Sequence, residues 1–155
     1  MVIRLEERRK AQALRSSELR GILKYMSRYW KGSQSTHRLM YHLVWVPKYR
    51  KRVLKGKVAD RISELLHECA DLQRWKIEEL NIQEDHVHIL VRMRPEVSVS
   101  RMVQLFKGMS SKVIRKEFPG LKEFLWGKSF WADGYFAETT GTVHEAKIRE
   151  YIKNQ

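Results

Sequence analysis

The chain has 155 residues, of which 43% are hydrophobic and only three are proline, a composition typical of one folded domain. Its 31 Lys and Arg outnumber 18 Asp and Glu, and the formal charge of +13 favours a polyanionic partner. We expect nucleic acid rather than an anionic membrane surface, because no apolar run is long enough to span a bilayer. The lone Cys69 excludes an internal disulfide and, with no apolar signal-peptide core at the start, indicates a cytoplasmic protein.

Residues 1–31 form a basic segment with nine Lys or Arg and three Glu, and its apolar residues recur at near-helical spacing. This pattern predicts an N-terminal helical extension, docked on the body or lying along a phosphate backbone. The polar stretch 32–35 then forms a joint to a main domain over 36–155.

Apolar periodicity in the main domain predicts strands over 39–46, 76–83, 86–93 and 131–139, and helices over 58–74, 99–117 and from 142 onward. Ser98 can cap the second helix, and Thr142 with Glu145 has the form of a capping box. The order βαββαβα predicts an α+β, ferredoxin-like fold with a four-stranded antiparallel sheet and helices on one face. The other face stays free for a ligand or for the last helix.

The segment 84–93 carries the most informative pattern. Val87, Ile89 and the following odd positions are apolar, whereas His86 and His88 alternate with them and share the opposite face, about 7 Å apart. Two imidazoles at that spacing can hold a divalent cation, although two strand histidines with ordinary hydrogen-bond partners fit the pattern too. His42 lies inside the first predicted strand, where a satisfied core histidine is the commoner outcome and a third ligand the alternative.

The last predicted helix places Tyr151 and Gln155 four residues apart, one turn from each other on one face. Such a Tyr is usually core and such a Gln usually solvent-exposed. A phenol can, however, attack a phosphodiester when a cation polarises the phosphate. Nitrogen ligands from the two histidines and an oxygen ligand from Gln155 would suit Mn²⁺ or Mg²⁺.

Two groups of cations have the placement expected of phosphate contacts. One follows the first strand without an acidic residue among them. The other lies away from the apolar stripe of the second helix, where Ser110 and Ser111 are also expected. A charge run is usually a solvated surface, but the net charge favours DNA contacts from Lys48, Arg50, Lys51, Arg52, Arg101, Lys107, Lys112 and Arg115.

Together these residues resemble a family. From about Met26 to Gln155 the chain is similar to the single-tyrosine HUH transposases of small bacterial and archaeal insertion sequences, among them the REP-associated tyrosine transposases. The matching pieces are the stretches 37–50 and 131–136, Asn81 with His86-Val87-His88, Lys107-Gly108 with Ser110-Ser111, and Tyr151 to Gln155.

This resemblance implies that His86, His88 and Gln155 bind the metal and that Tyr151 is the nucleophile. It implies cleavage and rejoining of single-stranded DNA through a 5′-phosphotyrosine at element ends marked by hairpins. It also implies a homodimer with composite sites, in which the Tyr-bearing helix of one subunit serves the histidines of the other. The alternatives are a catalytically silent hairpin-binding protein of the same descent and an RNA-binding ferredoxin-like module, which leaves the histidine pair unexplained.

Overall fold

The computed structural model describes residues 20, 29–125 and 127–155, and the chain divides into two compact units, Met1–Arg38 and Leu39–Gln155. In the first unit β1 (Trp30–Lys31) pairs antiparallel with β2 (Thr36–His37). The helix predicted over 1–31 lies largely outside the described residues, but its last two positions are extended rather than helical. The stretch predicted as a joint is the turn of this short hairpin, closed by the Gly32 N–H donating to the Ser35 carbonyl at 2.6 Å.

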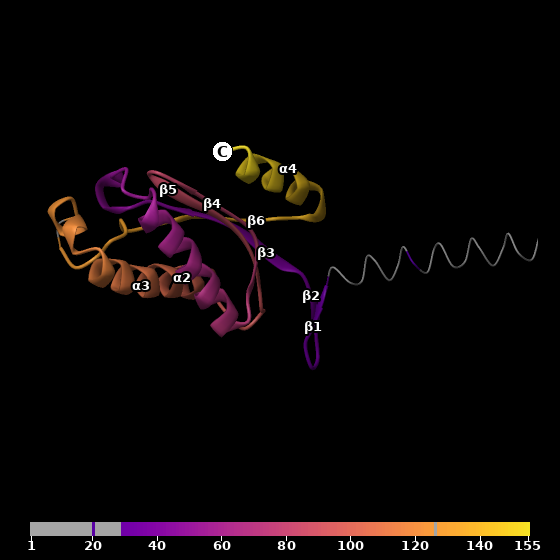
Figure 1. The fold of residues 1–155 in the computed structure, drawn as a ribbon. Helices are drawn as coiled ribbons and strands as arrows, with labels where there is room; N and C mark the ends of the chain where they lie inside the picture. The colour runs from indigo at the N-terminus through magenta and orange to yellow at the C-terminus, as the bar shows by residue number, and fades with distance from the viewer. Residues whose placement is uncertain (1–19, 21–28, 126) are drawn as a thin grey trace, which may run out of the picture. The chain divides into compact units, whose positions relative to one another are not determined.

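The second unit is a four-stranded antiparallel sheet with strand order β4-β5-β3-β6. The helices α2 and α3 cover one face and α4 lies on the other, as Figure 1 shows. The elements are β3 (Leu39–Trp45), α2 (Lys57–Gln73), β4 (Lys76–Gln83), β5 (His86–Met93), α3 (Val99–Glu117), β6 (Phe136–Thr139) and α4 (Thr142–Lys153), with short 3₁₀ turns at Lys48–Arg50 and Pro119–Glu123. The predicted order βαββαβα and the ferredoxin-like sheet are confirmed. None of the described helices is long and apolar enough to cross a membrane.

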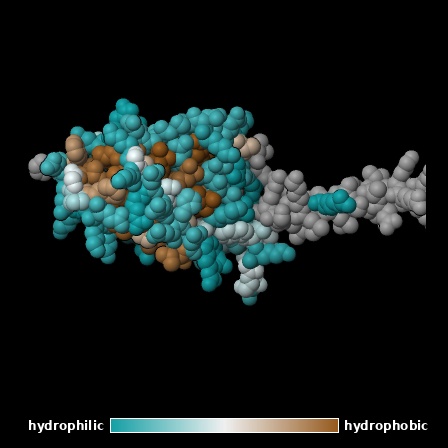
Figure 2. Space-filling model, in the orientation of Figure 1, coloured by the Kyte–Doolittle hydropathy of each residue, from teal (hydrophilic) through white to brown (hydrophobic). Residues whose placement is uncertain are grey.

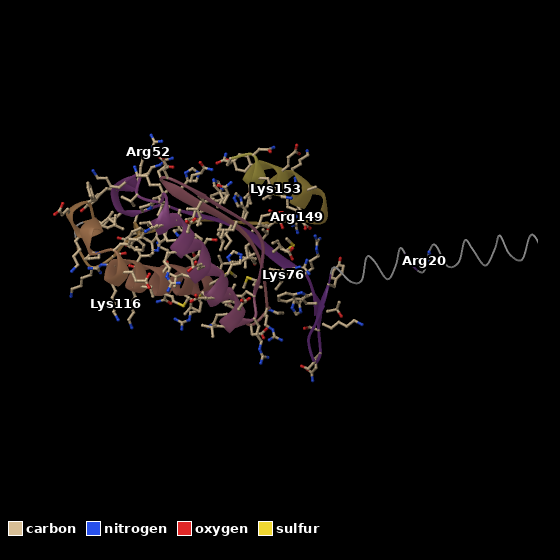
Figure 3. All side chains as sticks on the ribbon, viewed as in Figure 1. Arg20, Arg52, Lys76, Lys116, Arg149 and Lys153 are labelled. Carbon is tan, nitrogen blue, oxygen red and sulfur yellow. The ribbon has the colours of Figure 1, made fainter. Side chains whose placement is uncertain are left out.

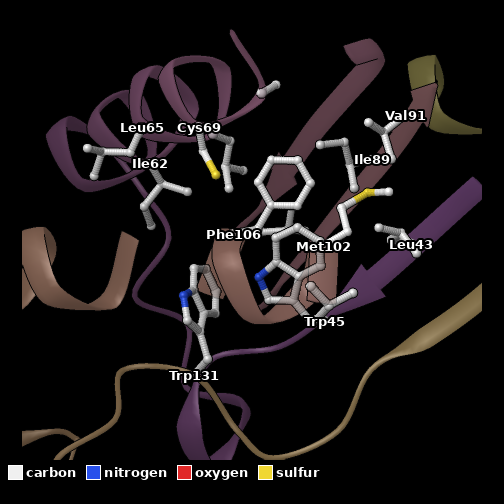
Figure 4. Packing of buried hydrophobic residues seen from close by; sticks show 14 of the residues in the cluster. Leu43, Trp45, Ile62, Leu65, Cys69, Ile89, Val91, Met102, Phe106 and Trp131 are labelled. Atoms are coloured by element: carbon white, nitrogen blue, oxygen red, sulfur yellow. The ribbon is translucent and has the colours of Figure 1, made fainter. Parts of the chain in front are cut away.

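The main core lies between the sheet and the layer of α2 and α3. Leu43 and Trp45 of β3 and Ile89 of β5 point into it, and Phe106 of α3 stacks on the Trp45 ring with 6.0 Å between ring centroids (Figure 4). Hydrophobic residues gather along the level of the sheet, whereas most of the visible surface is hydrophilic (Figure 2). Each fully buried large apolar side chain contributes about 1.5–3 kcal/mol to the free energy of folding, so this layer stabilises the packing of α2 and α3 on the sheet.

The segment before β6 differs from the prediction. The strand begins at Phe136 rather than near 131, and Trp131 makes only an isolated bridge to Pro47. The Trp131 indole N–H donates to Ser110 Oγ at 2.8 Å, and Gly134 takes a positive φ of 83°. Ser110 is therefore buried in the contact surface of α3, where the apolar pattern had placed it outside.

The two predicted helix caps have different outcomes. Ser98 Oγ accepts the Arg101 N–H at 3.2 Å, so the N-cap of α3 is confirmed. The capping box of α4 is wrong, because Gly141 takes the N-cap position and no side chain caps the helix. Thr142 is already the first helical residue, one position too late to act as the cap.

Candidate active site

His86 and His88 lie side by side on the face of the sheet that carries α4. Both belong to β5, and Val87 between them is buried in the main core on the other face. Their rings meet edge to face with centroids 4.7 Å apart. The alternation read from the sequence therefore places the two imidazoles together.

Tyr151 and Gln155, which come from the end of the chain, reach the same two histidines. The Tyr151 ring packs edge to face on His88 with a centroid distance of 5.5 Å, and Tyr151 remains 51% exposed. Gln155 Oε1 lies 3.3 Å from His86 Nε2, and the Gln155 side chain also approaches His88. One chain thus brings a solvent-accessible phenol and an amide oxygen to the histidine pair.

The end of α4 is anchored next to these histidines. Ile152 is 1% exposed and packs on Met40 and Leu90 in a second, small core. Asn81 Nδ2 donates to the Ile152 carbonyl at 2.8 Å, and Asn81 lies directly opposite His88 in the β4–β5 register. The helix C-terminus is therefore tied to the strand beside the site, which fixes where Tyr151 and Gln155 lie.

Ion pairs hold the middle of α4 to the sheet. Arg149, labelled in Figure 3, contacts Glu78 at 3.1 Å and Glu79 at 3.3 Å and is braced by Glu145 at 2.7 Å. Glu78 also pairs with the buried guanidinium of Arg92 at 3.1 Å. Burial opposes ionisation of Glu78, but Arg149 and Arg92 outweigh it and keep its pKa below the usual range.

Each imidazole of the pair has a partner at the ring nitrogen that faces away from Gln155. His86 Nδ1 lies 2.6 Å from Asp85 Oδ1. His88 Nδ1 lies 3.0 Å from His42 Nε2, and His42 Nδ1 lies 3.0 Å from Glu138 Oε1. His42 is therefore a hydrogen-bonded partner of His88, which is the commoner of the two outcomes considered for it.

The electrostatics keep His88 uncharged at neutral pH. Burial, followed by the repulsion of His86 and His42, lowers the pKa of His88 to about 4, and the contact with Gln155 offsets this only in part. The Asp85 carboxyl is desolvated, yet its hydrogen bond with His86 and the nearby Arg50 hold its pKa below the usual range. Neutral imidazole is the form that binds metals.

The donor set suits a hard or borderline divalent cation. In the part of the chain that the structure describes, no three His, Cys, Asp or Glu side chains are grouped to hold a metal, so a cation at the histidine pair would take its third protein ligand from another residue type. Gln155 Oε1 fits this need, because it lies 3.3 Å from His86 Nε2, the ring nitrogen that does not contact Asp85. Two imidazole nitrogens and one amide oxygen leave positions for phosphate oxygens and water.

The basic loop after β3 is partly neutralised by the turn before the histidines. Arg50 pairs with Asp85 at 3.0 Å and Arg52 with Glu84 at 2.8 Å, while Lys51 is exposed. Lys48 lies 5.5 Å from the centroid of the Tyr49 ring. These cations belong to the loop after β3. Two of them, Arg50 and Arg52, form ion pairs with acidic residues that no local sequence pattern indicated.

The cations of α3 border a groove of about 640 Å³ between that helix and the segment 128–135. Lys112, Arg115 and Lys128 line it beside Ser111 and Tyr135. The groove belongs to the helix layer, whereas the histidines and Tyr151 lie on the other face of the sheet.

Three of the four α3 cations predicted to bind DNA have partners within the chain, and one of them is Arg115, whose Nη2 donates to the Gly127 carbonyl at 2.9 Å. Lys107 Nζ donates to the carbonyls of Ala132 and Gly134 at 2.7 and 3.0 Å, and burial lowers the pKa of Lys107. Arg101 donates to Gln104 at 3.0 Å. Lys107 thus holds the backbone turn that forms one wall of the groove.

Sequence reasoning missed three residues around the site: Asp85 as the partner of His86, Glu138 as the partner of His42, and Asn81 as the anchor of α4. Asp85 adjoins the motif and was open to detection as a carboxylate next to a candidate ligand. Glu138 depends on the pairing of β3 with β6, which is 96 residues away from His42 in the chain. No local pattern indicates such a contact.

Comparison with known proteins finds relatives in sequence and in fold. Residues 35–155 match the family model described as "Transposase IS200 like". The ISDra2 transposase TnpA of Deinococcus radiodurans is 34% identical over 125 residues, which cover 81% of this chain and 89% of that protein. The transposase of insertion sequence element IS200 from Salmonella typhimurium is 34% identical over 115 residues, covering 74% of this chain and 75% of that protein.

Two solved structures are similar in fold. A crystal structure of a Deinococcus radiodurans protein, described there as a transposase, superposes with a TM-score of 0.68 at 33% identity, covering 81% of this chain and 97% of that one. The REP-associated tyrosine transposase bound to a REP hairpin gives a TM-score of 0.58 at 11% identity, covering 79% of this chain and 70% of that one. The second likeness is one of fold alone.

Proposed function

This chain belongs to the IS200-like transposases, and from that premise we propose that it is a metal-dependent transposase of single-stranded DNA that uses Tyr151 as its nucleophile. The observation that carries the proposal is the convergence of Tyr151, His86, His88 and Gln155 at one place on the sheet. Family membership supports DNA strand transfer in general, and the local geometry supports this particular set of residues.

The chemistry follows from the groups present. Tyr151 Oη attacks the scissile phosphorus, the bond from phosphorus to the 3′ oxygen breaks, and a 5′-phosphotyrosine and a free 3′-hydroxyl result. In the reverse step a 3′-hydroxyl attacks the phosphotyrosine and regenerates Tyr151, so no water or ATP is consumed. Bound Mg²⁺ or Mn²⁺, held by His86, His88 and Gln155, would supply charge stabilisation to the phosphate oxygens.

An open strip beside the site suits a single strand. Helix α4 packs on β4 and β5, and on the β6 side Phe136 remains 51% exposed, with its ring 5.9 Å from that of His42. An exposed aromatic ring beside His42 offers a stacking platform for a purine or a pyrimidine base. We assign the cationic groove of α3, with Lys112 and Arg115, to the phosphates of the hairpin.

A homodimer is part of the same proposal. Strand β6 is one of the two edge strands of the sheet and all four of its residues are exposed, so its outer backbone edge offers a pairing surface for a second copy. The contacts that dock α4 are made with sheet residues, and the same contacts would form on the sheet of a partner. The short joint at residues 140–141 would then allow composite sites with the same local geometry.

The alternative function is a catalytically silent hairpin-binding protein. A labelled single strand that carries the element end separates the two functions. The transposase should retain the label through SDS denaturation in Mg²⁺ or Mn²⁺ and lose it in chelator. A protein that binds the hairpin in native gels but never retains label in SDS would be the silent binder.

A further inference from the structure

His42 and Glu138 form a hydrogen-bond chain that ends on His88. The two residues are direct cross-strand partners in the β3–β6 register. Glu138 Oε1 lies 3.0 Å from His42 Nδ1, and His42 Nε2 lies 3.0 Å from His88 Nδ1. His42 and His88 are each 5% exposed, so the chain runs through the covered part of the sheet face behind the site.

With Glu138 ionised and His42 neutral, the carboxylate at the outer end determines the direction of every bond in this chain. An ionised carboxylate can only accept, so His42 must donate from Nδ1. A neutral imidazole carries one N–H, and His42 Nε2 is therefore an acceptor. The proton in the second contact then belongs to His88 Nδ1, which leaves a lone pair on His88 Nε2.

The reverse direction would block the site. If His42 donated from Nε2, a second proton on its ring or a lone pair facing Glu138 would be required. His88 would then accept at Nδ1 and carry its proton on Nε2, the nitrogen left free to act as a ligand. Orientation of a metal-binding imidazole by a hydrogen bond at its other nitrogen is a general feature of metal sites.

His86 is held in the same way by a shorter route. Asp85 Oδ1 accepts from His86 Nδ1 at 2.6 Å, which in a neutral imidazole leaves the lone pair on His86 Nε2. Each imidazole thus has its own carboxylate partner. Asp85 contacts His86 directly, whereas Glu138 acts on His88 through His42. We infer that His42 and Glu138 are positioning residues that hold His88 in its Nδ1–H tautomer, ready to bind a cation; the ligand role itself rests on the proposed function.

The tautomers can be measured without any metal, by nitrogen NMR of protein labelled with ¹⁵N-histidine in the presence of chelator. In the parent, His86 and His88 should both carry the proton on Nδ1. Glu138→Ala and His42→Phe should move His88 toward the Nε2–H form and leave His86 unchanged. Asp85→Ala should move His86 toward its Nε2–H form and leave His88 unchanged. Glu138→Gln, whose amide oxygen can still accept, should retain most of the parent signal.

Mn²⁺ binding, followed by electron paramagnetic resonance, gives a second readout. Glu138→Ala should weaken the affinity by about 10- to 100-fold, as is typical when an outer partner of a ligand is lost. The carboxylate control Glu123→Gln, at an exposed position in the helix layer, should leave affinity unchanged. The Glu138 side chain is 45% exposed, so its truncation should leave the fold intact.

An unchanged His88 tautomer in both Glu138→Ala and His42→Phe would overturn the inference. If the parent binds no Mn²⁺ while the tautomers change as described, the metal part of the proposed function fails and the hydrogen-bond chain stands. The two failures are therefore distinguishable.

Discussion

At the scale of single residues, substitution of His86 or His88 tests the proposed metal site most easily. His86→Ala or His88→Ala removes one of the two proposed nitrogen ligands and should reduce strand cleavage by more than the roughly 10- to 100-fold loss that follows removal of an outer partner. Hairpin affinity should persist, because it depends on phosphate contacts elsewhere. Cleavage assays over a range of Mg²⁺ and Mn²⁺, beside gel-shift measurements, check both parts. Full cleavage by the parent in excess chelator would contradict the metal hypothesis.

The low pKa of His88 also predicts a pH dependence of stability. Its pKa in the folded protein, about 4, lies below the ordinary value of 6.5, so the unfolded state binds the extra proton first. The contribution of neutral His88 to the free energy of unfolding is complete above about pH 6.5 and is lost as the pH falls toward 4. The slope of this loss is at most about 1.4 kcal/mol per pH unit. Urea unfolding in chelator should show a steeper acid loss in the parent than in His88→Asn. Equal slopes between pH 6 and 4.5 would contradict this assignment.

The site residues that could be predicted are those that lie close to each other in the sequence. His86 with His88, and Tyr151 with Gln155, have spacings that strand and helix geometry convert directly into shared faces. Asn81, His42 and Glu138 act across strands that are remote in sequence, so their roles depend on a register that periodicity does not determine. Ser110 was misplaced for a similar reason, since its hydrogen-bond partner Trp131 lies 21 residues away.

At the scale of elements, α3 and the segment 128–135 make a prediction about binding. Lys112 lines the groove, whereas the ammonium of Lys107 is bonded to two backbone carbonyls. Lys112→Ala should flatten the dependence of log K on log salt by about 0.7–0.9, the contribution of one phosphate, without changing which hairpin is preferred. Affinity measured at several salt concentrations tests this.

The matched control is Lys116→Ala, which removes a cation of the same helix that does not line the groove. Its slope should equal that of the parent. An unchanged salt slope in Lys112→Ala would mean that the groove does not contact the phosphates of the DNA.

Element boundaries were predictable where apolar period and terminal signals agree. The helices α2 and α3 and the strands β4 and β5 begin and end within about one residue of the prediction, because each combines a clear period with a cap or a turn. β6 is shorter than predicted because the aromatic residues before it pack against α3 instead of pairing in the sheet. α4 begins where predicted but without its predicted cap.

At the scale of the whole molecule, the question is which subunit α4 serves. Within one chain the helix docks on its own sheet through Ile152, Asn81 and Arg149, and a dimer could exchange it without losing a contact. The proposed composite sites predict that mixing inactive Tyr151→Phe with inactive His88→Ala restores cleavage, since a mixed dimer then contains one intact site. Co-expression with two affinity tags allows the mixed dimers to be purified and assayed beside each mutant alone. Persistent inactivity in verified mixed dimers would mean that Tyr151 serves its own subunit.

The central claim is that Tyr151 becomes covalently bonded to the 5′ phosphate of a cleaved strand. The direct measurement is mass spectrometry of the proteolysed adduct, after reaction of the parent with a single-stranded element end in Mn²⁺. The nucleotide-bearing peptide should contain Tyr151, and Tyr151→Phe should form no adduct while its fold and hairpin affinity remain. An adduct on the half-exposed Tyr135, or one that persists in Tyr151→Phe, would contradict the account.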